Sequence, residues 1–77
     1  MPGMTREQIV RSHTYQRPHG DQPERYERIR SAGREFALLL KELTPDTPEQ
    51  TLALRDVESA VMWANKSIAV NEVEVGG

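Results

Sequence analysis

Apolar residues recur at helical spacing along two long segments of the chain. Steps of three and four residues, as in a heptad repeat, are typical of an amphipathic helix with one apolar face. The stripe of the first segment, residues 22–43, is Tyr26, Ile29, Gly33, Phe36, Leu40 and Leu43, and that of the second, residues 48–71, is Leu54, Val57, Val61, Ala64 and Ile68. The short connection "TPDTP" at residues 44–48 predicts that the two helices pack antiparallel.

Capping chemistry marks three helix starts. Thr5 with Gln8 and Asp21 with Glu24 have the spacing of a capping box, and Thr47 is followed by Pro48 and then Gln50. The first helix should be short and end before Ser12, because Pro18 and Gly20 interrupt the segment that follows. We therefore expect a single all-α domain over residues 1–77, with an N-terminal helix and loop (1–20) followed by a helical hairpin (22–43 and 48–71).

The hairpin leaves apolar side chains outside its seam. The stretch "ESAVMWANKSIAVNE", residues 58–72, contains five consecutive apolar residues, which point all the way round a helix. Those outside the two stripes are Leu38, Leu39, Leu52, Ala60, Met62 and Trp63. We expect identical chains to cover this second surface, with Trp63, Met62, Leu39 and Ala60 at the interface. The alternative is that the N-terminal segment folds back and covers it with Ile9 and Val10.

Composition narrows the class of protein. The 77 residues include no cysteine, and no apolar run approaches the roughly 20 residues needed to span a bilayer. We expect a soluble, cytoplasmic protein without a membrane partner. The net charge is −2, but residues 1–34 carry seven Lys/Arg against four Asp/Glu, whereas residues 42–77 carry two against seven. This asymmetry favours a small anionic ligand over DNA or RNA, with an ordinary solvated surface as the alternative.

Catalytic constellations are not recognisable. The sequence offers no nucleophile paired with a base, no phosphate-binding glycine loop and no set of metal ligands. His13 and His19 are six positions apart and are best explained as solvated loop histidines. We therefore expect no enzyme, no cofactor and no metal.

A loop with an aromatic residue precedes an arginine-rich helix start. In "HTYQRPHGD", residues 13–21, Tyr15 offers a face on which a base can stack, and His19 offers a hydrogen bond. Guanidinium groups can donate hydrogen bonds to phosphate oxygens. Four arginines lie in this loop or near the start of the following helix: Arg17, Arg28, Arg30 and Arg34. Arg28 has Glu24 at ion-pair spacing, and Tyr26 and Trp63 are assigned to the core or an interface.

Residues 13–72 resemble a known family. The segments "DQPERYERIRSAGREFALLLKEL" and "TPDTPEQTLALRDVESAVMWANKSIAVNE", with the preceding tyrosine loop, are similar to the small hairpin domain of phage anti-defence sponges. That family includes anti-CBASS type two proteins and part of the Thoeris anti-defence type one proteins. The most specific fragment is "ESAVMWANKSIAVNE".

The resemblance implies an all-α protomer that assembles into a homo-oligomer, typically a hexamer. Such an assembly sequesters cyclic nucleotide messengers of bacterial immunity without cleaving them, in the cytoplasm of the infected host. Cyclic dinucleotides are the implied ligands, with cyclic trinucleotides and cyclic ADP-ribose isomers as further candidates. The pocket lies between protomers, where Tyr15 would stack on a base and Arg30 of a neighbouring chain would hold phosphate, aided by Gln16, Arg17, His19 and Arg34.

The chain departs from the family pattern in two places. His13 replaces a frequent aromatic residue, and Gln16, Arg17 and Pro18 replace a His-Pro-Pro run. Val70 stands where many members have a basic residue that would serve cyclic trinucleotides. From the residues alone, a second hypothesis stays open: a helical-hairpin module whose apolar face docks on a different protein.

Overall fold

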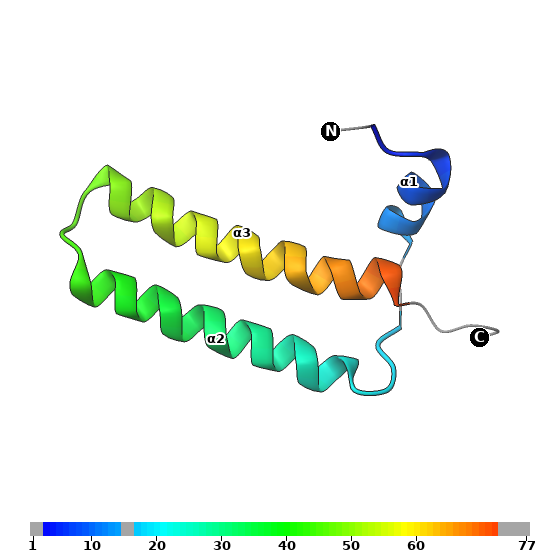
Figure 1. Ribbon diagram of the computed structural model, residues 1–77, viewed down its shortest axis with the longest axis horizontal. Coiled ribbons are helices and arrows are strands. Elements are labelled where there is room, and N and C mark those ends of the chain that lie inside the picture. Colours follow the sequence, from blue (N-terminus) through cyan, green and yellow to red (C-terminus); the bar gives the residue numbers. More distant parts are fainter. Residues whose placement is uncertain (1–2, 15–16, 73–77) are drawn as a thin grey trace.

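The computed structural model describes residues 3–14 and 17–72, and all regular structure in these ranges is helical. The helices are α1 (Arg6–His13), α2 (Gln22–Leu43) and α3 (Pro48–Asn71). Helices α2 and α3 lie antiparallel, side by side, and α1 lies at the open end of this hairpin, close to the end of α3 (Figure 1). The all-α prediction is thus confirmed for the described part of the chain. The first helix does not end before Ser12 as expected: it continues to His13, which is therefore not a loop residue.

Two of the three predicted caps form. At the start of α1, Thr5 Oγ1 accepts a hydrogen bond from the Gln8 amide at 3.1 Å, and Gln8 Oε1 accepts one from the Thr5 amide at 2.8 Å. This is a complete capping box. At the start of α3, Thr47 Oγ1 accepts from the Gln50 amide at 3.2 Å. Both helices therefore begin where local sequence satisfies their free amides.

The predicted capping box at Asp21 is wrong. Asp21 precedes α2, but its side chain makes no capping hydrogen bond. Its carboxylate lies instead 3.2 Å from Nε of Arg25, one helical turn along. Only the guanidinium offers the carboxylate a full positive charge, so the ion pair with Arg25 forms in place of the cap.

The seam between α2 and α3 differs from the predicted stripe on one side. On α3 the five predicted residues are all half-buried. On α2, however, Phe36 is 52% exposed and Leu43 is 68% exposed, while Ala37 is half-buried. A straight helix turns every 3.6 residues, so a strict heptad drifts around its surface by about 20° per repeat. The half-buried residues of α2 therefore run from Gly33 to Ala37 and Leu40, and the placement of Phe36 and Leu43 in the seam was wrong.

The best-buried side chains of the described ranges are glutamines at the two ends of the hairpin. Gln50 is 6% exposed, and its amide nitrogen donates to the Thr44 carbonyl at 3.1 Å and to Thr44 Oγ1 at 2.9 Å, which ties α3 to the end of α2. Gln22, at the opposite end, is 3% exposed and donates to the Glu72 carbonyl at 2.8 Å. Polar contacts thus fasten both ends of the apolar seam.

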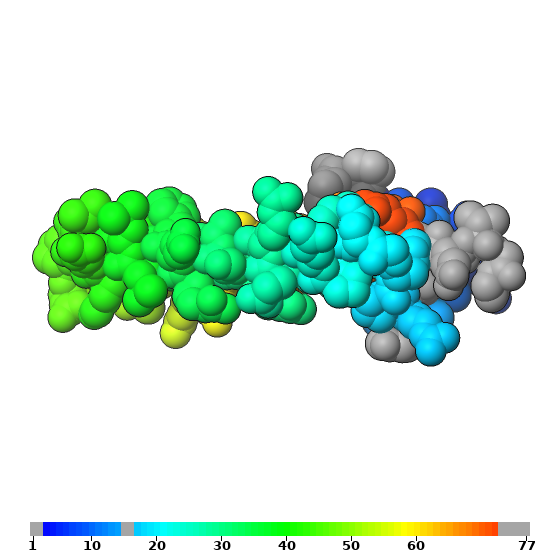
Figure 2. Space-filling model, turned by 90° about the horizontal axis from the view of Figure 1, so that it is seen from below, coloured from blue at the N-terminus to red at the C-terminus, as the bar shows by residue number. Residues whose placement is uncertain are grey.

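Much apolar surface faces outward. Among residues 3–14 and 17–72 no apolar side chain is fully buried. The molecule measures 50 × 30 × 16 Å, and seen from the α2 edge the hairpin is narrow (Figure 2). Large apolar residues expected outside the seam are all exposed in this single chain: Leu38 (65%), Leu39 (46%), Leu52 (60%), Met62 (53%) and Trp63 (60%).

The alternative cover for this surface is not found. Ile9 and Val10 are themselves 48% and 59% exposed. Helix α1 lies at the open end of the hairpin rather than along the middle of α3 (Figure 1). The apolar surface of the hairpin therefore stays uncovered by the described part of the chain.

Candidate functional site

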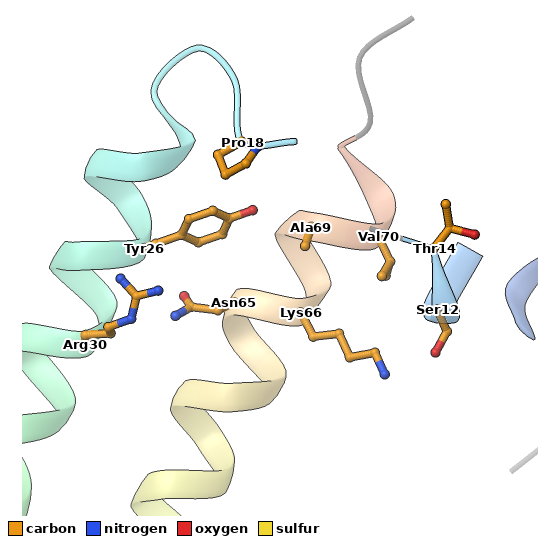
Figure 3. Close-up of a pocket in the computed structure, with 9 residues that line it drawn as sticks. All are labelled: Ser12, Thr14, Pro18, Tyr26, Arg30, Asn65, Lys66, Ala69 and Val70. Carbon is orange, nitrogen blue, oxygen red and sulfur yellow. The ribbon is translucent and has the colours of Figure 1, made fainter. Parts of the chain in front are cut away.

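A pocket of about 410 Å³ lies at the open end of the hairpin, a volume within the usual range of about 300–1,000 Å³ for small-molecule sites. Four segments contribute to it: the end of α1, the loop before α2, the first turns of α2 and the last turns of α3 (Figure 3). Its lining residues are Ser12, Thr14, Pro18, Tyr26, Arg30, Asn65, Lys66, Ala69 and Val70. The sequence in this region therefore brings both polar and apolar groups to one concave surface.

Helix α2 supplies an aromatic ring and a guanidinium group. The Arg30 guanidinium lies 6.0 Å from the centre of the Tyr26 ring, and Arg30 faces Asn65 across the helices (Figure 3). Arg30 is 53% exposed and forms a long ion pair with Glu27, 3.7 Å between the charged atoms. Exposed pairs of this kind contribute at most about 1 kcal/mol, so the guanidinium can exchange Glu27 for an anionic ligand at little cost.

Helix α3 supplies an amide and a second cation, both of which sequence analysis missed. Asn65 Oδ1 is buried without a hydrogen-bond partner among the described residues. Lys66 leaves α3 on the side opposite to Asn65 and extends toward Ser12 (Figure 3). Its ammonium lies 5.6 Å from the centre of the Trp63 ring. Only the pairing of α3 with α2 reveals that these two residues share a pocket with Arg30.

The predicted ligand residues are partly gathered. Arg30 lines the pocket, and Arg34, one turn further along α2, shares Glu27 with it at 3.8 Å. Arg17 is exposed, directly before the pocket residue Pro18. Tyr15 and Gln16 lie outside the described residues, between Thr14 and Arg17 in the sequence.

His19 has partners within the protein. Its Nε2 lies 2.8 Å from the Glu72 carbonyl, and its backbone amide donates to Gln22 Oε1 at 3.2 Å. His13, in α1, contacts the Ile9 carbonyl at 3.0 Å through Nδ1. No group of three or more metal-ligating side chains occurs among the described residues.

The expected ion pair between Arg28 and Glu24 does not form. These two side chains make no contact within ion-pair distance, and Glu27 instead bridges Arg30 and Arg34 on the same helix. Spacing alone predicted the pair. Glu27 is therefore the acidic residue that pairs with the pocket residue Arg30.

Four residues form a contact between the end of α3 and the start of α2, which we call the Glu72 cluster: His19, Gln22, Arg25 and Glu72. Both terminal nitrogens of Arg25 donate to the Glu72 carboxylate, one of them at 3.0 Å. The hydrogen bonds from Arg25 lower the pKa of Glu72, and the hydrogen bond to Glu72 raises the pKa of Arg25. The pair is thus ionised at neutral pH.

The pocket has the chemistry of an anion site with an aromatic wall. Its cations come from both helices of the hairpin, and the Tyr26 hydroxyl and the Asn65 amide are available for hydrogen bonds.

None of the helices in residues 3–14 and 17–72 has the length and apolar character that crossing a membrane requires.

Comparison with known proteins gives one match. The family model described as "Acb2/Tad1, hairpin domain" matches residues 6–69. Neither the curated proteins nor the solved structures contain a match to the chain. The matched range covers both sides of the pocket and most of the hairpin, and the chain therefore belongs to the Acb2/Tad1 hairpin-domain family of anti-CBASS and anti-Thoeris sponges.

Proposed function

We propose that this protein binds cyclic oligonucleotide messengers of bacterial immunity and holds them without cleaving them. The observation that carries the proposal is that one pocket is lined by Arg30, which faces Asn65, and by Lys66 on the opposite side of α3 (Figure 3). In the sequence, Tyr15 lies between the lining residues Thr14 and Pro18. Family membership supports the same function. The messenger would be withdrawn from its effector, which stays inactive.

Cyclic dinucleotides suit the groups on the pocket walls. Each phosphodiester carries one negative charge, for which the Arg30 guanidinium and the Lys66 ammonium are partners of opposite sign. The bases would stack on aromatic rings, a contact typically worth about 1–3 kcal/mol. We assign the stacking to Tyr15, with Gln16, Arg17, His19 and Arg34 as neighbouring contacts.

Val70 bears on the choice between ligands. It lines the pocket and carries no charge. A cyclic trinucleotide has one phosphodiester more than a dinucleotide, and the uncharged Val70 offers that additional phosphate no cationic partner. We therefore expect dinucleotides to bind more tightly. Cyclic ADP-ribose isomers also present negatively charged phosphates and belong in the same screen.

A second chain would complete the pocket. The exposed apolar residues around Trp63 need a partner, and covering one large apolar side chain is worth roughly 1.5–3 kcal/mol. We propose that copies of this chain meet through Trp63, Met62, Leu39 and Ala60, with a hexamer as the expected assembly. Tyr15 of one protomer would then act with Arg30 of another, in the cytoplasm of an infected bacterium.

Binding and release of intact ligand test the proposal. The protein is incubated with 3′,3′-cyclic GMP–AMP, separated from free ligand and digested, and the released nucleotide is identified by mass spectrometry. Intact cyclic nucleotide is the expected product, whereas a linear product would make the protein an enzyme. Arg30→Gln should weaken binding at least tenfold, and the matched control Arg55→Gln, on the exposed surface of α3, should not.

The second candidate function is a module that docks on a different protein. The exposed apolar side chains of α2 and α3 favour it, because patches of this kind mark interaction sites. Sedimentation of the purified protein discriminates between the two. A closed assembly of several copies supports the sponge, and a monomer with no affinity for cyclic nucleotides supports the docking module.

A further inference from the structure

The end of α3 lacks the partners that usually stabilise a helix C-terminus. No basic residue occurs in its last turn, although the final carbonyls of a helix need donors and favour positive charge. These donors come from other segments. Arg11 donates to the Val70 carbonyl at 3.4 Å, and His19 and Gln22 both contact the Glu72 carbonyl at 2.8 Å.

An acidic side chain at this place is unfavourable on its own. The C-terminus of a helix carries partial negative charge, so a carboxylate there is repelled unless a cation compensates it. Glu72, the C-cap residue of α3, is compensated by both terminal nitrogens of Arg25. The unfavourable carboxylate at the end of α3 is thus neutralised by a guanidinium from the first turn of α2.

The same contacts hold one wall of the pocket. His19 follows the lining residue Pro18 directly. Its backbone amide donates to Gln22 Oε1, and its ring contacts the backbone carbonyl of Glu72. Tyr26, another lining residue, follows Arg25 on α2. The segment 17–20 is therefore anchored to the end of α3 at the edge of the pocket, although Glu72 itself does not line it. Glu72 lies beyond the range that matches the family model.

We propose that Glu72 is a positioning residue that fixes segment 17–20 against the pocket. This inference rests on the proposed function for its effect on affinity. A loop that is already in place loses less conformational entropy when ligand binds, so the affinity is higher. The Glu72 side chain acts through Arg25: their ion pair holds the end of α3, and with it the Glu72 backbone carbonyl, in place for Gln22 and His19. Glu72 does not line the pocket.

The test compares Glu72→Gln with wild type in two measurements. Calorimetry with 3′,3′-cyclic GMP–AMP gives the affinity, and amide hydrogen exchange followed by NMR gives the protection of His19 and Gln22. Loss of the ion pair should weaken binding about tenfold, which is the scale expected for one or two side chains that must be ordered anew. It should also speed the exchange of the His19 amide several-fold.

Two further variants separate positioning from general destabilisation. The charge-reversed pair Arg25→Glu with Glu72→Arg restores the ion pair and should recover most of the affinity when it is combined with Asp21→Asn, because the Asp21 carboxylate, 3.2 Å from Arg25 in wild type, would otherwise repel the new carboxylate. The control Asp46→Asn removes the comparable exposed ion pair to Lys41 at the other end of the hairpin, and it should change neither affinity nor His19 exchange. Gln22→Leu, which keeps Glu72 and Arg25, should loosen segment 17–20 in the same way as Glu72→Gln.

The outcomes are distinct. If wild type binds and Glu72→Gln binds equally well, the positioning role is overturned and the proposed function stands. Weaker binding with unchanged His19 exchange overturns it too, because the effect would then not pass through the loop. If wild type binds no cyclic nucleotide, the proposed function falls together with the effect on affinity, while the exchange data still decide whether Glu72 anchors the segment.

Discussion

Gly33 of α2 lies directly against Val61 of α3: a Cβ atom built on Gly33 would lie 2.4 Å from Val61 Cγ2. Val61 has a stiff, β-branched side chain that cannot rotate freely out of the way. Gly33→Ala should therefore lower the free energy of unfolding by about 1 kcal/mol, as an overpacking cost of about 1–3 kcal/mol exceeds the roughly 1 kcal/mol gained in helix propensity. Urea denaturation measures the change.

The Val61→Ala background is the control for this prediction. There the contact partner is gone, so Gly33→Ala should keep only the gain in helix propensity and become stabilising. A substitution that destabilises equally in both backgrounds would show that the side chain of Val61 is not the obstacle.

Gln50 should be important for stability although it is polar. Gln50→Leu removes the donor that serves the Thr44 carbonyl and hydroxyl, and each intramolecular hydrogen bond contributes about 0.5–1.5 kcal/mol net. The free energy of unfolding should fall by a similar amount in urea titrations. The exposed neighbour variant Thr51→Ala should shift it by less than about 0.5 kcal/mol. An unchanged Gln50→Leu protein would mean that the turn is held by other contacts.

Acid should remove the contribution of the Glu72–Arg25 pair. The hydrogen bonds from Arg25 lower the pKa of Glu72 below its ordinary value of 4.5, so its contribution to stability is complete above that value. It is lost as the pH falls through the lowered pKa of the folded state. The stability difference between wild type and Glu72→Gln should therefore shrink between pH 5 and the lowest pH at which both are folded, as thermal melts at each pH would measure. The same comparison with Glu58→Gln, an exposed carboxylate without an ion-pair partner among the described residues, should give a flat difference.

Glu27 should oppose ligand binding. Its carboxylate lies 3.7 Å from Arg30 and 3.8 Å from Arg34, where it competes with phosphate for both guanidinium groups. Glu27→Gln should tighten the binding of 3′,3′-cyclic GMP–AMP about threefold, in line with the value of exposed ion pairs, and less so in high salt. Calorimetry at two salt concentrations tests this, with Glu35→Gln as the control on the same helix. Weaker binding would indicate that Glu27 itself contacts the ligand.

Trp63→Asp should disrupt self-association. Trp63 is 60% exposed in the single chain, and a carboxylate buried there without a partner would make an interface unfavourable. Sedimentation should show smaller particles, and ligand binding should weaken because the second chain no longer completes the pocket. Val10→Asp places the same charge at a site of similar exposure, 59%, on α1 and should leave the assembly intact. Wild-type size for Trp63→Asp would exclude Trp63 from the interface.

The fold could be predicted where the deciding interactions are local. The Thr5 and Thr47 caps involve residues three positions away, and both appear in the structure as the sequence suggests. Asp21 followed the same rule and failed, because Arg25 competed for its carboxylate. Phe36 failed since the repeat was taken as a strict heptad, while the helix pair follows its own period.

The site was less predictable because it depends on how the two helices align. Arg30 was found from its charge and position, yet Asn65 and Lys66 sit in a run that reads as ordinary helix surface. They line the same pocket as Arg30 only because α3 lies beside α2. His19 was expected to face a ligand, and its contact with the Glu72 carbonyl, 53 positions away, has no local signal.

The two buried glutamines have a consequence for the alignment of the helices. Small and half-buried residues in the middle of the seam would tolerate a slide of one helical turn, about 5.4 Å, far better than directional hydrogen bonds do. Gln22 and Gln50 therefore fix the register of the two helices from opposite ends of the hairpin, because neither set of hydrogen bonds would survive such a slide. The position of Arg30 relative to Lys66 therefore depends on hydrogen bonds at both ends of the hairpin. A change at the turn between α2 and α3 can thus alter how a ligand is bound at the open end.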